Sequence, residues 1–369
     1  MLGPWLGGRV GCVRERRLRV GLIGLGAVGR LHLEAYRTAM RIEVVAVAEP
    51  DPDRREAARA PEVRLYTNAA DMLAQEQLDI ACVLTPAASH AAMTLLCATA
   101  GVHVLCEKPL AGSLAEATAM IDACQTANVQ LAYGASYRFL PAVARAQALI
   151  AEGAVGQVVL LREQAIGGAG PTNRQIMPPD HYSPGQPGGS PMGLVDHGVH
   201  LIDAFAWMTG ARVVSALGRG NVSGRALSPE YLLMTLSNGA VGSLLYDEGT
   251  YPTELPAEGL FSWGASWDAD GFHSGGLWAA SPGTIHVHGT RGALRIAHYA
   301  NALFLTDKDG QRQLPLEGRP APHHFAAQID AFAEDLLAAR APRSNATDGL
   351  IALKVLMAAY RANGGFVAI

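Results

Sequence analysis

The chain has 369 residues, a net charge of −4 at neutral pH and a hydrophobic content of 49%. This length can bury a large core and favours two domains over one. The slightly acidic balance gives no electrostatic reason to expect nucleic acid or an anionic membrane as a partner. Because no uninterrupted apolar stretch reaches roughly 18 residues, we expect no membrane-spanning helix.

The cysteines and the N-terminus bear on the compartment. The five cysteines are scattered and lack CxxC spacing, which favours buried thiols in a reducing compartment over disulfides or a zinc site. We expect residues 1–17 to form a disordered basic tail. Arg16-Arg17 before an apolar run also resembles a twin-arginine export signal, but cleaving that run would remove the glycine loop described below. We therefore expect a cytoplasmic protein.

Strand-like apolar runs alternate with helical patterns from Leu18 to about Phe139. This alternation predicts right-handed crossovers and a parallel sheet with helices on both faces. The expected strands are 19–23, 43–48, 80–84, 102–106 and 130–134, and the expected helices are 28–38, 53–58, 69–74, 90–100 and 113–127.

The pattern changes after a helix expected at 143–152. A strand at 155–164 precedes a Gly/Pro-rich loop at 167–191 and a helix at about 193–209. Short strands in quick succession then predict an open, mostly antiparallel sheet. These strands are 212–217, 231–236, 240–246, 284–288 and 293–296, and helices at 324–339 and 346–361 close the chain. The fold class is α/β, with a doubly wound parallel sheet at 18–139 and an α/β domain with an open sheet at 140–369.

A glycine motif follows the first strand. Gly24-x-Gly26-x-x-Gly29 lies between that strand and the first helix, the context in which such a motif binds a dinucleotide. Gly24 permits the tight turn, Gly26 lets the backbone approach a pyrophosphate, and Gly29 lets the helix pack closely on the strand. The helix N-terminus supplies N–H groups and a positive dipole end. We therefore expect 18–139 to be a Rossmann domain.

An acidic residue ends the second strand. Glu49 stands twenty positions after Gly29, where a carboxylate can bind a ribose 2′-hydroxyl. A carboxylate repels a 2′-phosphate, so Glu49 favours NAD, with NADP as the alternative. Arg54 and Arg55 follow closely; they partly reverse this preference if they face the ribose, and are solvated helix residues if they do not.

Several motifs occur in a characteristic order along the chain. They are Thr85-Pro86 and His90 after the fourth strand, Glu107-Lys108-Pro109, Arg138-Phe139, the run Asp196-His197-Gly198-Val199-His200-Leu201-Ile202-Asp203, and the segment from Asp348-Gly349 to Ala359-Tyr360. With the glycine loop, they resemble the Gfo/Idh/MocA oxidoreductases over nearly the whole chain from Leu18. The resemblance implies a cis Lys108–Pro109 bond. The expected cofactor-binding residues are Gly24, Gly26, Ala27, Val28, Gly29, Glu49, Thr85, Pro86, His90, Glu107, Lys108, Pro109 and Arg138.

Three residues are candidates for the chemistry. A neutral histidine suits removal of the proton from a sugar hydroxyl as hydride leaves for the nicotinamide, so we expect His200 to be the base. Asp196 lies four positions earlier and shares a helix face with it, where it orients the substrate or tunes the histidine. Lys108, at the carboxyl end of a parallel strand, is placed to stabilise charge on the reacting oxygen. The family implies the same three roles. The competing interpretations are a core histidine and a surface lysine, and Asp203 is expected to be structural.

A metal site at Asp196, His197 and His200 is an alternative interpretation, since His and carboxylate side chains suit zinc or manganese. His197 points about 100° away from Asp196 on a helix, so only two of the three converge, and no metal is expected.

Two long segments are interpreted as elaborations. The loop 167–191 carries Arg174, His181 and Tyr182 and is placed to cover the substrate. The segment 252–282 carries Trp263, Trp267 and Trp278 with His273, which form either a carbohydrate platform or a subunit contact.

The function expected from the sequence is NAD(P)-dependent oxidation of a secondary hydroxyl on a sugar, inositol or related polyol, with hydride passing to nicotinamide C4. The expected assembly is a homodimer or homotetramer formed through the C-terminal sheet. Two alternatives remain open. One is a glycosidase that uses retained NAD by transient oxidation, and the other is a regulator that senses dinucleotide without catalysis.

Overall fold

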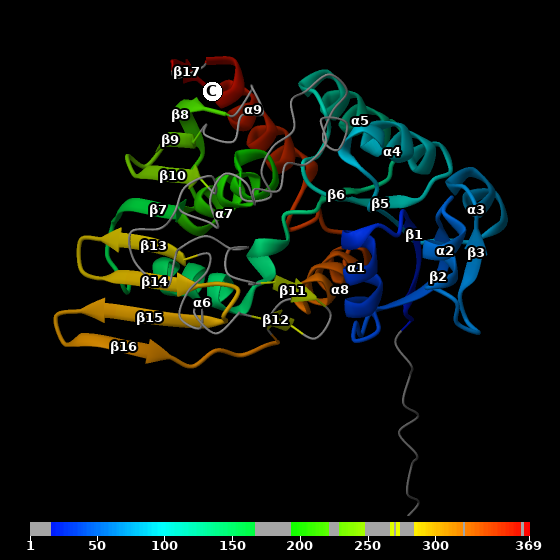
Figure 1. Cartoon of the computed structure of the whole chain (residues 1–369), viewed down its shortest axis with the longest axis horizontal. Helices are drawn as coiled ribbons and strands as arrows, with labels where there is room; N and C mark the ends of the chain where they lie inside the picture. Colours follow the sequence, from blue (N-terminus) through cyan, green and yellow to red (C-terminus); the bar gives the residue numbers. More distant parts are fainter. Residues whose placement is uncertain are drawn as a thin grey trace, which may run out of the picture.

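A computed structural model provides the fold and the side-chain contacts (Figure 1). It describes residues 16–166, 193–220, 229–247, 266–268, 271–273, 284–319, 322–362 and 365–369. The tail expected at 1–17 lies outside the described residues except for Arg16 and Arg17.

The N-terminal sheet has six parallel strands. They are β1 (Leu18–Ile23), β2 (Ile42–Ala48), β3 (Arg64–Tyr66), β4 (Ile80–Val83), β5 (His103–Cys106) and β6 (Leu131–Tyr133). Their order, β3-β2-β1-β4-β5-β6, is that of a doubly wound dinucleotide-binding sheet. The expected parallel sheet is confirmed, and β3 is a strand that the sequence analysis did not predict.

Helices cover both faces of this sheet because its strands are apolar on both sides. The helices are α1 (Ala27–Tyr36), α2 (Pro52–Glu56), α3 (Ala69–Gln75), α4 (His90–Thr99) and α5 (Leu114–Thr126), with a 3₁₀ turn at Ala87–Ser89. Alternate strand residues divide between two cores. Leu22 and Leu105 face α1, whereas Ile23 and Val104 pack with α3, α4 and α5.

Helix α8 (His324–Leu337), which the sequence analysis placed with the second domain, packs on the first sheet (Figure 1). Its Phe325, Ile329 and Phe332 join Leu22 in the core on the α1 side. Asp330 on this helix also accepts hydrogen bonds of 2.8–3.0 Å from the backbone N–H groups that precede β2. A helix from the final third of the chain therefore completes the cover on one face of the N-terminal sheet.

The second sheet has nine strands in the order β16-β15-β14-β13-β7-β10-β9-β8-β17. All neighbours are antiparallel except the parallel pair β7 and β10, which confirms an open, mostly antiparallel sheet. The strands are β7 (Val158–Ile166), β8 (Val213–Arg219), β9 (Glu230–Leu236), β10 (Val241–Asp247), β13 (Thr284–Gly289), β14 (Ala293–Ala297), β15 (Ala302–Asp307), β16 (Gly310–Leu314) and β17 (Phe366–Ala368).

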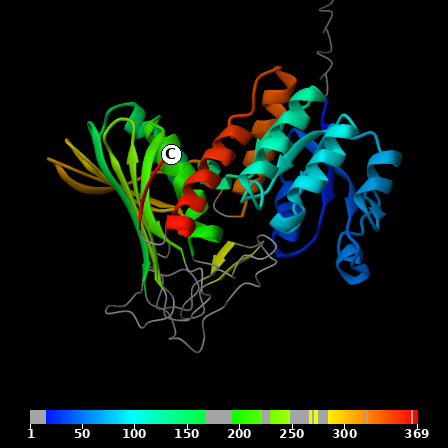
Figure 2. The same cartoon turned by 90° about the horizontal axis from the view of Figure 1, so that it is seen from above.

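Helices line one face of this second sheet, the face that looks toward the first domain (Figure 2). They are α6 (Pro141–Ala151), α7 (Val199–Thr209) and α9 (Ala346–Ala362). A 3₁₀ turn at Ser136–Phe139 precedes α6, and a π-helical turn at Leu194–Gly198 precedes α7. The opposite face carries exposed apolar side chains such as Leu233, which is 45% exposed. Strands β11 (Ser266–Asp268) and β12 (Gly271–His273) pair separately as a small antiparallel ribbon.

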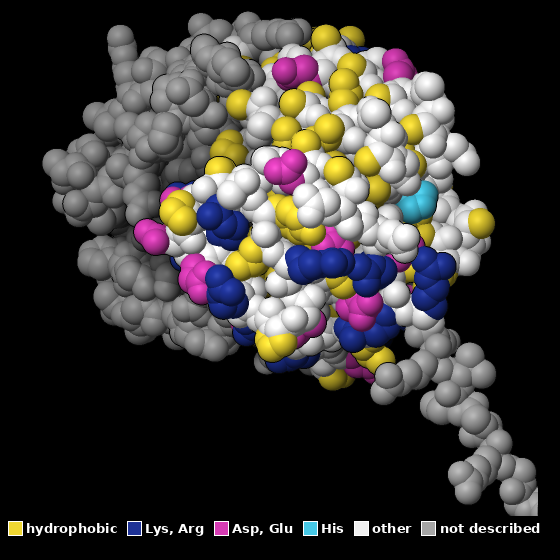
Figure 3. Space-filling model, turned by 90° about the vertical axis from the view of Figure 1, so that its right-hand side faces the viewer, with side chains coloured by type: hydrophobic (Ala, Val, Ile, Leu, Met, Phe, Trp, Pro, Cys, Tyr) yellow, Lys and Arg dark blue, Asp and Glu magenta, His cyan; other side chains and the backbone are white. Residues whose placement is uncertain are grey.

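The side of the N-terminal domain seen in Figure 3 mixes basic and acidic side chains. Ion pairs of this domain include Arg16 with Asp79 at 2.6 Å and Arg19 with Glu76 at 3.3 Å. Within the described part of the chain, no helix has the length and apolarity needed to cross a membrane.

Candidate active site

The glycine loop has the geometry that a pyrophosphate site requires. Gly24 adopts a φ of +94°, which side chains rarely tolerate. A Cβ on Gly29 would lie 2.4 Å from the Gly24 carbonyl oxygen, so the close packing of α1 needs glycine there. A Cβ on Gly26 would meet no protein atom within 4 Å. The space at Gly26 and the α1 N-terminus at Ala27 and Val28, which no described side chain caps, fit a dinucleotide phosphate.

Glu49 lies beside this loop. Its carboxylate accepts hydrogen bonds from the Leu25 N–H at 2.6 Å and from the Asp51 N–H at 2.9 Å, and the residue is 4% exposed. A carboxylate offers about four acceptor positions, so two remain for ribose hydroxyls. Arg55 instead donates to the backbone carbonyls of Glu49 and Pro50 at 2.6 and 3.0 Å, while Arg54 lies 3.8 Å from the Asp51 carboxylate.

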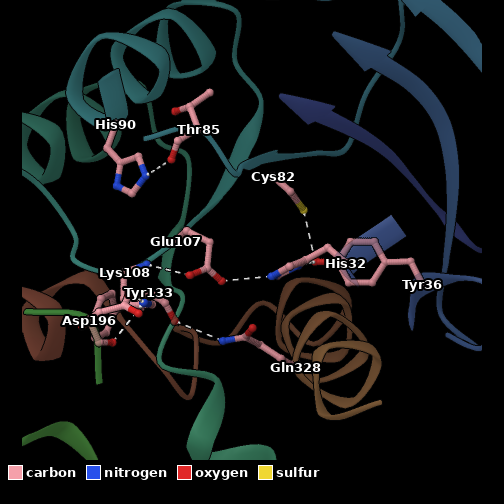
Figure 4. Close-up of polar contacts among 10 residues, drawn as sticks. All are labelled: His32, Tyr36, Cys82, Thr85, His90, Glu107, Lys108, Tyr133, Asp196 and Gln328. Carbon is pink, nitrogen blue, oxygen red and sulfur yellow. Dashed lines mark hydrogen bonds and ion pairs between the residues drawn. The ribbon is translucent and has the colours of Figure 1, made fainter. Parts of the chain in front are cut away.

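The Glu107-Lys108-Pro109 segment leaves the end of β5 with a cis Lys108–Pro109 bond, as expected. Glu107 lies beneath it, 5% exposed. Its carboxylate accepts from the Lys108 N–H at 3.0 Å and lies 3.0 Å from His32 Nε2 (Figure 4). Burial raises the pKa of Glu107, but the hydrogen bonds and charges of His32 and Lys108 together outweigh burial and leave that pKa below its usual value. Glu107 therefore links the Lys108 backbone to His32 on α1 and holds it in position.

Lys108 reaches from the first domain to the second. Its Nζ donates to the Asp196 carbonyl oxygen at 3.0 Å and forms an ion pair with the Asp196 carboxylate (Figure 4). The side chains are 13% and 27% exposed, so the pair is neither fully buried nor free in solvent. The structure thus brings together two of the three residues expected to carry the chemistry.

His200 lies on α7, one turn beyond Asp196. Its ring stacks on that of Tyr137, with centroids 4.0 Å apart and an interplanar angle of 5°. The side chain is buried, and Nδ1 has no hydrogen-bond partner among the described residues. Burial, then the positive charge of Lys108, holds the pKa of His200 well below its ordinary value of 6.5. His200 is therefore neutral at physiological pH, the form that can accept a proton.

The helix that carries these residues differs from the expectation. The sequence predicted one α-helix over 193–209, whereas the structure has a π-helical turn at Leu194–Gly198 before α7 begins at Val199. Both His197 N–H and Gly198 N–H bond to the Gly193 carbonyl, at 3.0 and 3.1 Å. The four-residue spacing of Asp196 and His200 therefore spans a widened turn, and the argument from regular α-helical spacing was wrong in its premise.

Some expected cofactor residues make protein contacts. The ring nitrogens of His90 lie 2.9 Å from the Pro109 carbonyl and 2.8 Å from the Thr85 carbonyl, so His90 braces the cis segment against the loop after β4. Burial lowers the pKa of His90. Thr85 Oγ1 is buried without a partner among the described residues, whereas Pro86 is exposed. Contact of these residues with a cofactor remains a prediction.

Arg138 is held in an ion-pair network. Its Nε donates to one oxygen of Asp203 at 2.7 Å, and its Nη2 donates to the other. Nη2 also donates to the Asp348 carboxylate at 2.9 Å, and Nη1 donates to the Arg343 carbonyl oxygen at 2.8 Å. Arg138 and Asp203 are buried. These contacts agree with the structural role expected of Asp203; a cofactor contact by Arg138 remains a prediction.

The structure also reveals a buried cluster that the sequence analysis did not assemble. Glu163 on β7, His197 on the π-helical turn and His298 after β14 place their ligand atoms within 4.8 Å of one another. His197 thus turns away from Asp196, as expected, but toward residues remote in sequence. The expected loop residues Arg174, His181, Tyr182, Trp263 and Trp278 lie outside the described residues, as do the side chains of Trp267 and His273.

The first sheet, its glycine loop and its acidic β2 end define a dinucleotide-binding protein with a second α/β domain. Two family models match, an NAD-binding Rossmann fold of the oxidoreductase family at residues 18–135 and the GFO/IDH/MocA C-terminal domain at residues 143–295. The chain belongs to the Gfo/Idh/MocA oxidoreductase family.

Individual relatives differ in how much of them the chain matches. The D-apiose dehydrogenase of Paraburkholderia graminis is 41% identical over 143 residues, which cover 38% of this chain and 38% of that protein. The D-glucoside 3-dehydrogenase of Escherichia coli is 26% identical over 81% of this chain and 77% of its own. Among solved structures, an aldose-aldose oxidoreductase from Caulobacter crescentus in complex with glycerol superposes with a TM-score of 0.76 at 21% identity, covering 96% of this chain and 100% of that one.

Proposed function

We propose that the protein is an NAD-dependent dehydrogenase that oxidises a secondary hydroxyl of a sugar, inositol or related polyol. The observation that carries the proposal is the ion pair between Lys108 and Asp196 on the helix segment that bears His200. This ion pair joins the second domain to the carboxyl end of a Rossmann strand. Open α/β sheets bind their ligands at the carboxyl ends of their strands.

The three side chains divide the work. Oxidation of the alcohol removes a hydride from carbon and a proton from oxygen, and the bound dinucleotide supplies the hydride acceptor at nicotinamide C4. Neutral His200 takes the proton. The Lys108 ammonium donates a hydrogen bond to the same oxygen and stabilises the charge that develops there. Asp196 orients Lys108 and offers an acceptor to a neighbouring hydroxyl.

Cofactor and substrate class have separate support. Glu49 beside the glycine loop favours NAD over NADP because its carboxylate repels a 2′-phosphate. The sugar class is supported by the names of two relatives, D-apiose dehydrogenase and D-glucoside 3-dehydrogenase.

The test is a substrate panel with NAD and, separately, NADP, read as absorbance of the reduced nicotinamide. We expect turnover with one class of sugar, inositol or sugar acid. At saturating NAD, Lys108→Met should lower kcat by about 10²–10³-fold and His200→Ala by about 10²–10⁴-fold. The matched control is Lys308→Met, a lysine whose side chain is 86% exposed. NAD binding without turnover on any substrate would instead favour a retained-cofactor glycosidase or a sensor.

The proposal extends to assembly and location. The outer face of the nine-stranded sheet leaves Val159, Leu233 and Phe366 52%, 45% and 68% exposed, which supports a homodimer or homotetramer formed through it. Light scattering on the native protein measures its oligomeric state, and Leu233→Lys should shift that state toward the monomer. A native protein that is already a monomer contradicts the proposal. Four described cysteines are buried free thiols, which supports a cytoplasmic location.

A further inference from the structure

A carboxylate and two imidazoles converge beneath the catalytic helix. Glu163 enters from β7, His197 from the π-helical turn and His298 from the residue after β14. Glu163 and His298 are fully buried, and His197 is 2% exposed. The three elements are separated in sequence, so the second domain's fold creates the cluster.

Part of this cluster has no hydrogen-bond partner. Glu163 Oε1 and both ring nitrogens of His298 are buried without one among the described residues. His298 Nε2 lies 3.8 Å from a Glu163 oxygen, too far for a hydrogen bond. Buried polar atoms of native proteins are nearly always satisfied, so this gap calls for an occupant.

The spacing suits a metal ion. Two ligands about 2.1 Å from a tetrahedral zinc ion stand about 3.4 Å apart, close to the 3.8 Å between His298 Nε2 and the Glu163 oxygen. His197 Nε2 lies 2.7 Å from the other Glu163 oxygen, so a small shift of the carboxylate completes the set. Two imidazoles and one carboxylate form a donor set suited to zinc, with a fourth position for water.

Neighbouring tyrosines hold the ligands as outer partners of a metal site do. The Tyr137 hydroxyl lies 3.0 Å from His197 Nδ1, and it can accept the proton of Nδ1 when Nε2 donates its lone pair. The Tyr246 hydroxyl donates to Glu163 Oε2 at 2.9 Å. Both contacts fix side-chain orientation.

We propose that Glu163, His197 and His298 bind a divalent metal ion of the zinc class, which braces the π-helical turn that carries Asp196. This site is distinct from the three residues of the proposed reaction and does not rest on that function. The brace would tie together β7, the π-helical turn and the chain after β14. It also reaches His200 through Tyr137, whose ring stacks on the histidine and whose hydroxyl contacts His197.

The experiment measures metal in the full-length protein without an affinity tag, produced with added zinc and dialysed. We expect about one ion per chain by mass spectrometry, visible absorption of tetrahedral Co²⁺ after exchange, and a fall in Tm on chelation that zinc reverses. Glu163→Gln preserves shape and His298→Asn removes a ligand, and each should lower metal affinity by more than about tenfold.

The matched control is His288→Gln, because His288 is exposed and pairs with His286 on one strand, with ring centroids 6.4 Å apart. It should keep its metal. Zinc that disappears with His288→Gln but survives His298→Asn would be an adventitious ion only, and would overturn the proposal. A metal-free wild-type protein that gives no Co²⁺ bands and no Tm response to zinc would overturn it as well, and would leave buried water as the occupant.

Discussion

The phenol ring of Tyr137 lies flat against the imidazole of His200, with 4.0 Å between centroids and 5° between planes. Tyr137 comes from the 3₁₀ turn that joins the two domains, and His200 comes from α7. The stack fixes the plane of the proposed base and keeps water from one of its faces. Burial of the same ring is the main cause of its lowered pKa.

This lowered pKa predicts the acid side of the pH profile. The active base is neutral imidazole, and its pKa lies well below 6.5, so protonation removes activity only at more acidic pH. We expect kcat/KM to stay level as the pH falls through 6.5 and to decline below it. The residual activity of His200→Ala should lack this acid limb. A limb centred at or above 6.5 that disappears in His200→Ala contradicts the assignment.

Glu49→Gln tests the choice of dinucleotide. The amide oxygen can still accept from the Leu25 N–H, which lies 2.6 Å from the carboxylate in the native chain. The Asp51 N–H then loses its acceptor, because the amide nitrogen is itself a donor. The side chain keeps its size while its charge is lost. A hydrogen bond to a charged group contributes about 1.5–3 kcal/mol, so NAD affinity should fall by about tenfold or more. NADP affinity should rise because the repulsion is gone. Titration calorimetry with both dinucleotides checks this, and an unchanged preference would assign Glu49 to the loop alone.

Two glycine substitutions separate cofactor space from protein packing. In Gly26→Ala the new methyl meets no protein atom, so Tm should be unchanged while NAD binds about tenfold more weakly, a loss of about 1.4 kcal/mol. In Gly29→Ala the methyl would lie 2.4 Å from the Gly24 carbonyl oxygen, so in this variant the free energy of unfolding should fall by about 1–3 kcal/mol. Full NAD affinity in Gly26→Ala would place the pyrophosphate elsewhere.

Arg138→Leu tests the ion-pair network. Removing one partner of a buried pair leaves Asp203 uncompensated and costs about 3–5 kcal/mol, whereas the double variant Arg138→Leu/Asp203→Leu should recover part of that loss. Chemical denaturation measures both. Unaltered NAD affinity in the folded single variant would assign Arg138 to structure. A large loss of NAD affinity without destabilisation would instead support the cofactor contact that the sequence predicts.

Buried apolar strands were predictable from sequence because burial on both faces leaves a hydrophobic run, as in β2, in the four-residue β4 and in the three-residue β6. Strands with exposed side chains carry no such pattern. Strand β3 has three residues and none fully buried, and β16 reads Gly-Gln-Arg-Gln-Leu with mostly exposed side chains. Both were missed for that reason.

The catalytic candidates were predictable because their motifs are contiguous in the chain. The π-helical turn was not, since hydrophobic spacing does not distinguish a widened turn from a regular one at a single position. The Glu163, His197 and His298 cluster was also invisible to spacing. Its members meet only when three separate elements pack together.

The return of α8 to the first sheet has a consequence for biosynthesis. A ribosome makes the six strands early, yet Phe325, Ile329 and Phe332, which cover one side of them, emerge only after most of the second domain. Until then Leu22 and its neighbours lack these contacts, and the nascent chain exposes a hydrophobic surface that chaperones bind. A fragment that ends near residue 139 should expose the same surface permanently, and we expect it to aggregate rather than fold as an independent domain.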